Sequence, residues 1–322
     1  MNFDLLIDNL TNPALLFFIL GILAVQLKSD LAIPENSSKF ISLYLLFSIG
    51  FKGGQELAHS TLGIDILLVL LFGVLLALIV PVYTFFILKK RVGVYNAGAI
   101  AAAYGSVSAV TFITAVSFLE MQQIDFGGHM VAVMAVMEAP SIIIGVFLLS
   151  VFSNEKEKNN SVPFLKLVKH SLTNGSVLLI IGSLVIGYMA NEKQAQGIAP
   201  FTTDIFKGFL AVFLLDMGIV SGRRLAALCK NGVFPFVFAI IVPLINGILV
   251  AFASRFVTDS HGDQLLLSIL AASASYIAVP AAMKMAAPKA NPGLYIPMAL
   301  AITFPFNITL GMPLYLYIIE YL

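Results

Sequence analysis

Ten long apolar segments separated by short polar loops constrain this chain more than any other feature. Each is near the ~20 residues that an α-helix needs to cross a bilayer. Each is also continuous rather than alternating, which excludes β-barrel spans. Hydrophobic residues make up 59% of the chain and charged residues only 11%, too few to cover a soluble surface. We therefore expect an all-α integral membrane protein. The predicted spans are 13–29, 36–56, 63–89, 94–118, 126–152, 164–190, 200–222, 232–257, 264–286 and 293–319.

The longest polar stretch lies between the fifth and sixth predicted spans. It divides the chain into a first half (1–152), a linker (153–163) and a second half (164–322). Five spans is an odd number, so the halves would insert with opposite topology, as an inverted repeat about an axis in the membrane plane. Three matches recur in the same order at offsets of 166 to 168 residues. They pair Gly50, Gly54 and Leu57 with Gly218, Gly222 and Leu225, then 106–108 with 273–275, then Ile142 and Gly145 with Ile308 and Gly311.

Short polar interruptions lie in the middle of the fourth and ninth predicted spans. Repeated breaks at matching places indicate a transporter binding site at the bilayer midplane. An unwound helix leaves a half-helix N-terminus with free N–H donors and partial positive charge, which suits a small anion. The alternative is that small residues only allow close helix packing. The predicted substrate-binding residues are Gly105, Ser106, Val107 and Ser108 with Ser273, Ala274, Ser275 and Tyr276.

A cation site is predicted from oxygen-bearing residues in the same spans. Glu138 falls about midway along the fifth span, where a carboxylate is costly and usually functional. Thr111 and Asn307 would add neutral oxygen ligands of the kind that hard cations prefer. Glu138 has two alternatives, a proton-carrying role and a structural ion pair. For Asn307 the alternative is that it only satisfies backbone freed by Pro305.

Several function classes are excluded or disfavoured. The chain has one cysteine, Cys229, and four histidines, which makes a Cys/His metal site improbable. No nucleophile and base pair occurs at matching depth, so we expect no enzyme and no cofactor beyond Na⁺ as a coupling ion. The net charge of +1 argues against a nucleic-acid partner.

Orientation follows from Lys and Arg, which concentrate on the cytoplasmic side of membrane proteins. Of the 18 basic residues, 14 fall on the side of the central linker and 4 on the side of the termini. We expect the linker in the cytoplasm and both termini outside or in the periplasm, in a multi-pass protein of the cell (inner) membrane. No positive segment precedes the first apolar run, so the first span is expected to be retained.

Several short motifs are distributed along the chain. They are 33–35 (Ile-Pro-Glu), 49–54 (Ile-Gly-Phe-Lys-Gly-Gly), Gly105 to Ser108 with Thr111, Leu119 with Glu120, 137–140 (Met-Glu-Ala-Pro), 271–273 (Ala-Ala-Ser) and 290–292 (Ala-Asn-Pro). Taken together they resemble the sodium-dependent bicarbonate transporters of cyanobacteria, the SbtA-type permeases. The similarity extends over nearly the whole chain apart from the central loop.

The resemblance implies ten helices in two groups, a gate domain (spans 1, 2, 6 and 7) and a mobile core domain (spans 3–5 and 8–10). It further implies a homotrimer in lipid that imports HCO₃⁻ with Na⁺ by an elevator-type movement, with a PII-like cytoplasmic regulator. This sequence departs from the family pattern in four ways. Tyr276 replaces an acid in the ninth span, Glu138 replaces an Asp, and Ala109 and Val110 replace a Gly-Ser before Thr111. The central loop is also short, which weakens the expectation of a regulator.

Three hypotheses remain open from the sequence. The first is Na⁺-coupled bicarbonate symport. The second is H⁺-coupled or Na⁺-independent transport of another small anion. The third is a membrane sensor that keeps a transporter fold without net transport.

Overall fold

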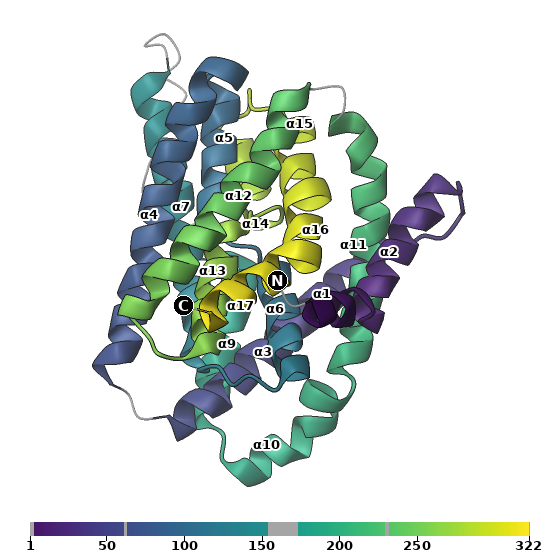
Figure 1. The fold of residues 1–322 in the computed structure, drawn as a ribbon, viewed down its shortest axis with the longest axis vertical. Helices are drawn as coiled ribbons and strands as arrows, with labels where there is room; N and C mark the ends of the chain where they lie inside the picture. The colour runs from purple at the N-terminus through teal and green to yellow at the C-terminus, as the bar shows by residue number, and fades with distance from the viewer. Residues whose placement is uncertain (1–2, 61–62, 154–172, 229–231, 322) are drawn as a thin grey trace.

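The computed structural model describes residues 3–60, 63–153, 173–228 and 232–321, and every regular element in these ranges is helical (Figure 1). The prediction of an all-α chain is therefore confirmed. The α-helices are α1 (Phe3–Leu10), α2 (Pro13–Gln26), α3 (Glu35–His59), α4 (Ile64–Val92), α5 (Val94–Gly105), α6 (Ala109–Gln122), α7 (His129–Phe152), α9 (Gly175–Met189), α10 (Glu192–Ala199), α11 (Phe206–Leu228), α12 (Val233–Ala253), α13 (His261–Ala272), α14 (Ala278–Ala286), α15 (Pro292–Pro297), α16 (Phe304–Phe306) and α17 (Met312–Glu320).

Six of the described stretches are long and apolar enough to cross a membrane, one of them α5 and α6 taken together. They are 64–92, 94–122, 129–152, 192–225, 233–256 and 292–320. Helices α2 and α9 are apolar but shorter. The chain is thus a multi-pass membrane protein, and the full count of ten spans stays a prediction. The linker at 153–163 lies, apart from Ser153, outside the described residues.

Glycines allow close backbone packing in two helix pairs. Helix α2 packs along α11, and α3 packs along α9. A Cβ added at Gly218 of α11 would meet the Phe18 carbonyl carbon at 3.0 Å and Gly21 Cα at 3.1 Å. A Cβ at Gly54 of α3 would meet Tyr188 N at 2.6 Å. Because these positions carry no side chain, the paired backbones approach closely, as small residues allow in membrane helices.

The remaining helices pack into a second group. Helices α4, α5 and α7 contact one another, and α12 contacts α13 and α17. In Figure 1 the first three lie at one edge of the molecule, while α2 and α11 lie at the opposite edge. Contacts between the two groups run through α3 with α6 and α7, and through α11 with α15.

The last predicted span is not a regular α-helix. Two π-helical segments, η5 (Met298–Thr303) and η6 (Asn307–Gly311), alternate with α15, α16 and α17. Pro297, Pro305 and Pro313 lie along this stretch and cannot donate to the helical hydrogen-bond ladder. A short helix that the sequence analysis did not anticipate, α1, contributes Asn9, whose Nδ2 donates to the Ile308 and Thr309 carbonyl oxygens at 2.9 and 3.0 Å.

Replacement of Gly218 by Ala should destabilise the protein by about 1–3 kcal/mol, the usual cost of overpacking, because the new methyl group meets the α2 backbone. Gly208 in the same helix is the matched control, since a Cβ there meets nothing within 4 Å. Gly208→Ala should be neutral or stabilising by about 0.4–1 kcal/mol. Thermal unfolding of the purified variants measures both, and equal melting temperatures would contradict the close packing.

A candidate anion site at two broken helices

The first break separates α5 from α6. Helix α5 ends at Gly105 and α6 begins at Ala109, while Ser106 and Ser108 are extended, with φ/ψ of −81°/173° and −100°/107°. Gly105 lies against Pro81 of α4, whose backbone N would be 3.1 Å from an added Cβ. The Ser108 side chain caps α6 by accepting a hydrogen bond from Thr111 N at 3.2 Å. The break therefore lies where the sequence predicted it.

The second break separates α13 from α14. Helix α13 ends at Ala272, Ser273 is extended, and α14 begins at Ala278. No side chain caps α14. Its first N–H groups are therefore left without the Ser, Thr, Asp or Asn partner that usually satisfies them.

The two breaks are hydrogen-bonded to each other. Ser275 N donates to the Ala103 carbonyl oxygen at 2.8 Å, and Ser108 N donates to Ser273 Oγ at 3.0 Å. Residues that are separated by more than 160 positions in the chain thus form one unit. All four residues are buried, so these bonds are made away from water, where an unpaired group would cost about 1–3 kcal/mol.

A small cavity lies at the N-termini of both half-helices. Its volume is about 30 Å³, and a water-sized group needs roughly 10–15 Å³ by this measure. The cavity therefore suits a ligand of only a few heavy atoms. Its lining residues are Ser42, Leu46, Val107, Ser108, Ala109, Glu138, Ser176, Ser275, Tyr276, Ile277 and Ala278.

The donors of this cavity come from two helix ends and several hydroxyls. Ala109 and Ala278 are the first residues of α6 and α14, where the partial positive charge of each helix is concentrated. Ser108 and Ser275 add hydroxyl groups that both donate and accept. Such an arrangement can hold a small oxyanion without any basic side chain.

Glu138 lines this same cavity from α7. The structure thus places it beside Ser108 and Tyr276, whereas Thr111 and Asn307 are not among the lining residues. No described residue forms an ion pair or hydrogen bond with its carboxyl group, so the alternative of a structural ion pair finds no partner in the described ranges.

Several buried oxygens at the breaks lack a hydrogen-bond partner among the described residues. They are Ser106 Oγ, Thr111 Oγ1 and Asn307 Oδ1. Buried polar atoms are nearly always paired, so each of these oxygens is a candidate to contact a ligand or cation. No group of three or more His, Cys, Asp and Glu occurs in the described ranges. A cation here would therefore depend largely on neutral oxygens.

Asn307 is oriented by the second break. Its Nδ2 donates to the Ala272 carbonyl oxygen at 2.7 Å, which leaves Oδ1 as the free acceptor. Segment η6, which contains Asn307, contacts α6, which contains Thr111. The structure thus keeps these two predicted cation ligands on neighbouring elements. The carbonyl that Asn307 satisfies is freed by the end of α13 and not by Pro305, so the backbone role has a different partner from the predicted one and leaves Oδ1 available.

Sequence reasoning missed two residues that complete the breaks. Ser141 Oγ donates to the Gly105 carbonyl oxygen at the end of α5, and Asn246 Nδ2 donates to the Ala271 carbonyl oxygen at 3.1 Å. Asn246 is a polar residue inside the apolar helix α12, which was a usable signal. Ser141 gave none, because a lone Ser is common in membrane helices.

The Ser273→Ala variant should lower stability by about 1–3 kcal/mol, because it leaves the buried Ser108 N–H without its acceptor. Ser150→Ala is a suitable control, since the exposed Ser150 Oγ donates only to the Phe147 carbonyl oxygen within its own helix. Thermal unfolding in detergent would compare the two. A Ser273→Ala protein as stable as the control would show that the hydrogen bond between the breaks contributes little.

Comparison with known protein families matches residues 13–320 to the Na⁺-dependent bicarbonate transporter superfamily. A search of curated proteins found no match. The match covers nearly the whole chain and both breaks, and it identifies a transport protein rather than an enzyme. The chain belongs to the Na⁺-dependent bicarbonate transporter superfamily.

Proposed function

We propose that this protein is a secondary active transporter that imports bicarbonate together with Na⁺. One observation carries the proposal, namely that the N-termini of α6 and α14 line one small cavity together with Ser108 and Ser275. The family match supports bicarbonate and Na⁺ as the transported ions. Bicarbonate has four heavy atoms and one negative charge, which suits both the volume and the helix ends.

The anion would be held by backbone N–H groups and hydroxyls at 105–108 and 273–276. Tyr276 is the least expected member of this set. Its hydroxyl is buried and interacts with the Ser108 side chain. A phenol can donate to an anion without adding charge. Tyr276 would therefore replace a charged group by a neutral donor.

The cation would be held by Glu138, Thr111 and Asn307. The unpaired Thr111 and Asn307 oxygens support this assignment, and sodium favours such hard oxygen ligands. One Na⁺ moving with one HCO₃⁻ is electroneutral. The pair would thus avoid the large cost of carrying a bare charge through a low-dielectric environment.

The proposal includes a 5+5 inverted repeat over 1–152 and 164–322. The mirrored pairing of helices supports it. Helix α3, in the second predicted span, packs on α9 in the sixth, and α11, in the seventh, packs on α2 in the first. In the proposed repeat, span 1 corresponds to span 6 and span 2 to span 7. The contact between spans 2 and 6 therefore corresponds to the contact between spans 7 and 1. The glycines that make these contacts include Gly54 and Gly218, which lie in the motif that recurs at an offset of 168.

In this scheme α2, α3, α9 and α11 form the gate domain, and the remaining long helices form the core domain that moves in an elevator-type cycle. The chain would lie in the cell (inner) membrane with both termini outside and the central linker in the cytoplasm. A homotrimer follows from the family resemblance alone. The same holds for a PII-like regulator, and the short linker leaves little for it to contact.

The second candidate is H⁺-coupled or Na⁺-independent transport of a small anion. No basic partner for Glu138 occurs among the described residues, which favours this candidate, because an unpaired carboxylate can be neutralised by a proton as well as by Na⁺. A thermal-shift series with small anions, with and without Na⁺, would separate the two. Stabilisation independent of Na⁺ would favour this second candidate.

Protein in liposomes should accumulate ¹⁴C-bicarbonate when an inward Na⁺ gradient is applied. The Glu138→Gln variant should lose most Na⁺-driven uptake, and Ser108→Leu should abolish uptake because Leu would fill the cavity. Glu192→Gln, on the exposed helix α10, is the matched control and should transport like the parent. Uptake that ignored Na⁺ and both site variants would overturn the proposal.

Tyr276→Phe should weaken bicarbonate binding about tenfold, as expected for loss of one buried hydrogen bond to a charged ligand. Tyr188→Phe, at an exposed tyrosine of α9, should change nothing. Concentration dependence of uptake would show the loss as a raised KM. An unchanged KM in the Tyr276→Phe protein would remove this residue from the anion site.

A further inference from the structure

A second polar centre lies at the far end of α6 from the candidate site. Lys52 Nζ of α3 is 2.6 Å from Glu120 Oε1 of α6, and Lys207 Nζ of α11 is 3.8 Å from Glu120 Oε2. The side chains of Lys52 and Glu120 are only 31% and 25% exposed. One carboxylate thus joins a core helix to two gate helices.

Glu120 is unfavourably placed for α6 alone. It lies in the last turn of the helix, where the partial negative charge of the helix end repels a carboxylate. Local preference would place Lys or Arg there. The two lysines compensate this repulsion from outside the helix. A residue that breaks a local rule with a distant compensation is expected at a functional position.

The backbones of the same two groups touch beside this ion cluster. A Cβ added at Gly53 of α3 would be 3.1 Å from the Gly128 carbonyl oxygen, and one at Gly128 would be 2.9 Å from Leu57 N. The C-terminal part of α3 is therefore in close backbone contact with the turn that precedes α7. Neither glycine leaves room for a side chain.

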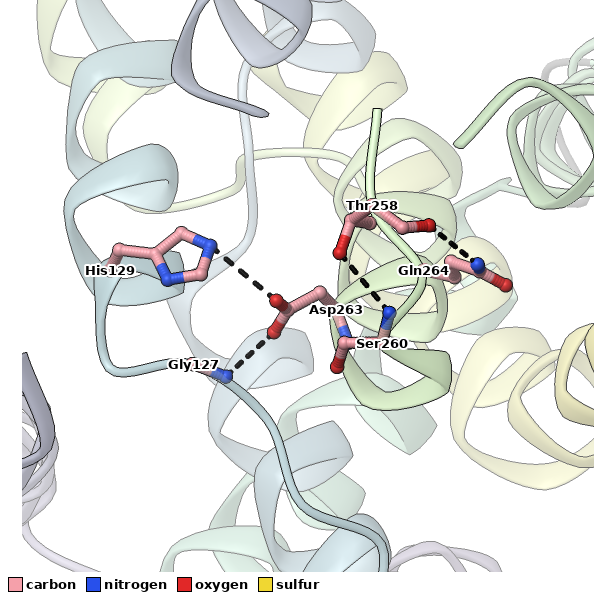
Figure 2. A network of polar contacts seen from close by, with 6 residues as sticks. All are labelled: Gly127, His129, Thr258, Ser260, Asp263 and Gln264. Atoms are coloured by element: carbon pink, nitrogen blue, oxygen red, sulfur yellow. Dashed lines mark hydrogen bonds and ion pairs between the residues drawn. The ribbon is translucent and has the colours of Figure 1, made fainter. Parts of the chain in front are cut away.

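Asp263 fixes the shape of this turn, as Figure 2 shows. Its Oδ1 accepts a hydrogen bond from Gly127 N at 2.7 Å, and its Oδ2 is 3.5 Å from His129 Nε2. The residues on both sides of Gly128 are thereby held by the start of α13. The surface against which α3 closes is thus a rigid part of the core group.

A cavity of about 320 Å³ lies next to the ion cluster. It is lined from α3 by Lys52 and Gly53 and from α6 by Val116 and Glu120, so it lies between a gate helix and a core helix. Val116 itself is 1% exposed. Separation of α3 from α6 would widen this cavity and uncover Val116.

We propose that Glu120, Lys52 and Lys207, together with the contact between Gly53 and Gly128, form a clasp that closes this end of the transport pathway. The clasp must open once in each cycle, and its strength sets the balance between the two states of the transporter. This inference rests on the proposed movement of the core against the gate. Helix α6 would connect the two sites mechanically, because it begins at the proposed anion cavity and ends at the clasp.

The test uses the full-length protein in detergent, where both faces are accessible. Cys229, the one cysteine of the chain, is replaced by Ser, and Val116→Cys serves as the reporter. Lys52→Gln and Glu120→Gln should each raise the rate of maleimide labelling at position 116 about three- to tenfold, the range for partly buried ion pairs. Lys193→Gln, at an exposed lysine of α10, should leave the rate unchanged.

A double-mutant cycle tests whether Lys52 and Glu120 affect the labelling rate through their contact with each other or independently. If the charges act on each other, the Lys52→Gln/Glu120→Gln double variant should label little faster than the Glu120→Gln protein. Additive effects, or no change in labelling by well-folded monodisperse variants, would overturn the proposal. Because labelling reports conformation and not transport, a shifted rate in a protein without bicarbonate uptake would refute the proposed substrate while leaving the clasp intact.

Discussion

Two interrupted helices in an apolar interior leave backbone N–H and C=O groups that need hydrogen-bond partners, and much of the surrounding structure supplies those partners. Each break frees backbone donors and acceptors that hydrocarbon cannot satisfy. The breaks satisfy part of this demand from each other, through Ser108 with Ser273 and Ala103 with Ser275. Each half of the chain therefore needs the other in order to keep its broken helix.

Side-chain hydrogen-bond partners at the breaks are found mainly at the C-terminal ends of the half-helices and less at their N-terminal ends. The carbonyl ends of α5 and α13 are closed by side chains, namely Ser141 at Gly105, Asn246 at Ala271 and Asn307 at Ala272. The donor end of α14 has no side-chain cap and lines the cavity. The open end of α14 carries a partial positive charge, which favours an anion although no basic side chain lines the cavity. Glu138 lines the same cavity, so in the proposed site a coupled cation would have to balance its carboxylate.

The sequence predicted the helical class, the approximate helix ranges and the position of both breaks, because these depend on local hydropathy and on Gly and Ser in apolar surroundings. It did not predict Ser141 or Asn246 as partners, or the packing of Asn9 against the last span. Those contacts join residues that lie far apart in the chain, and no local pattern records them. Glu138 was predicted to be functional from its place in an apolar span, and that role stays a prediction. Its position on the same cavity as Ser108 depends on how α7 packs against the breaks.

Helix α6 would couple the small cavity to the Lys52–Glu120 contact, because it is a stiff helix with one end at each. About eleven residues separate Ala109 from Glu120, so the helix spans roughly 16 Å at 1.5 Å per residue. Its N-terminal residue Ala109 lines the cavity between the breaks, and its C-terminal turn carries Glu120, whose carboxylate contacts Lys52 of α3 and Lys207 of α11. A helix is stiff over this distance. A displacement of α6 as one stiff body that weakens the contact between Lys52 and Glu120 would also move Ala109. Opening of the proposed clasp would therefore change the shape of the proposed anion cavity.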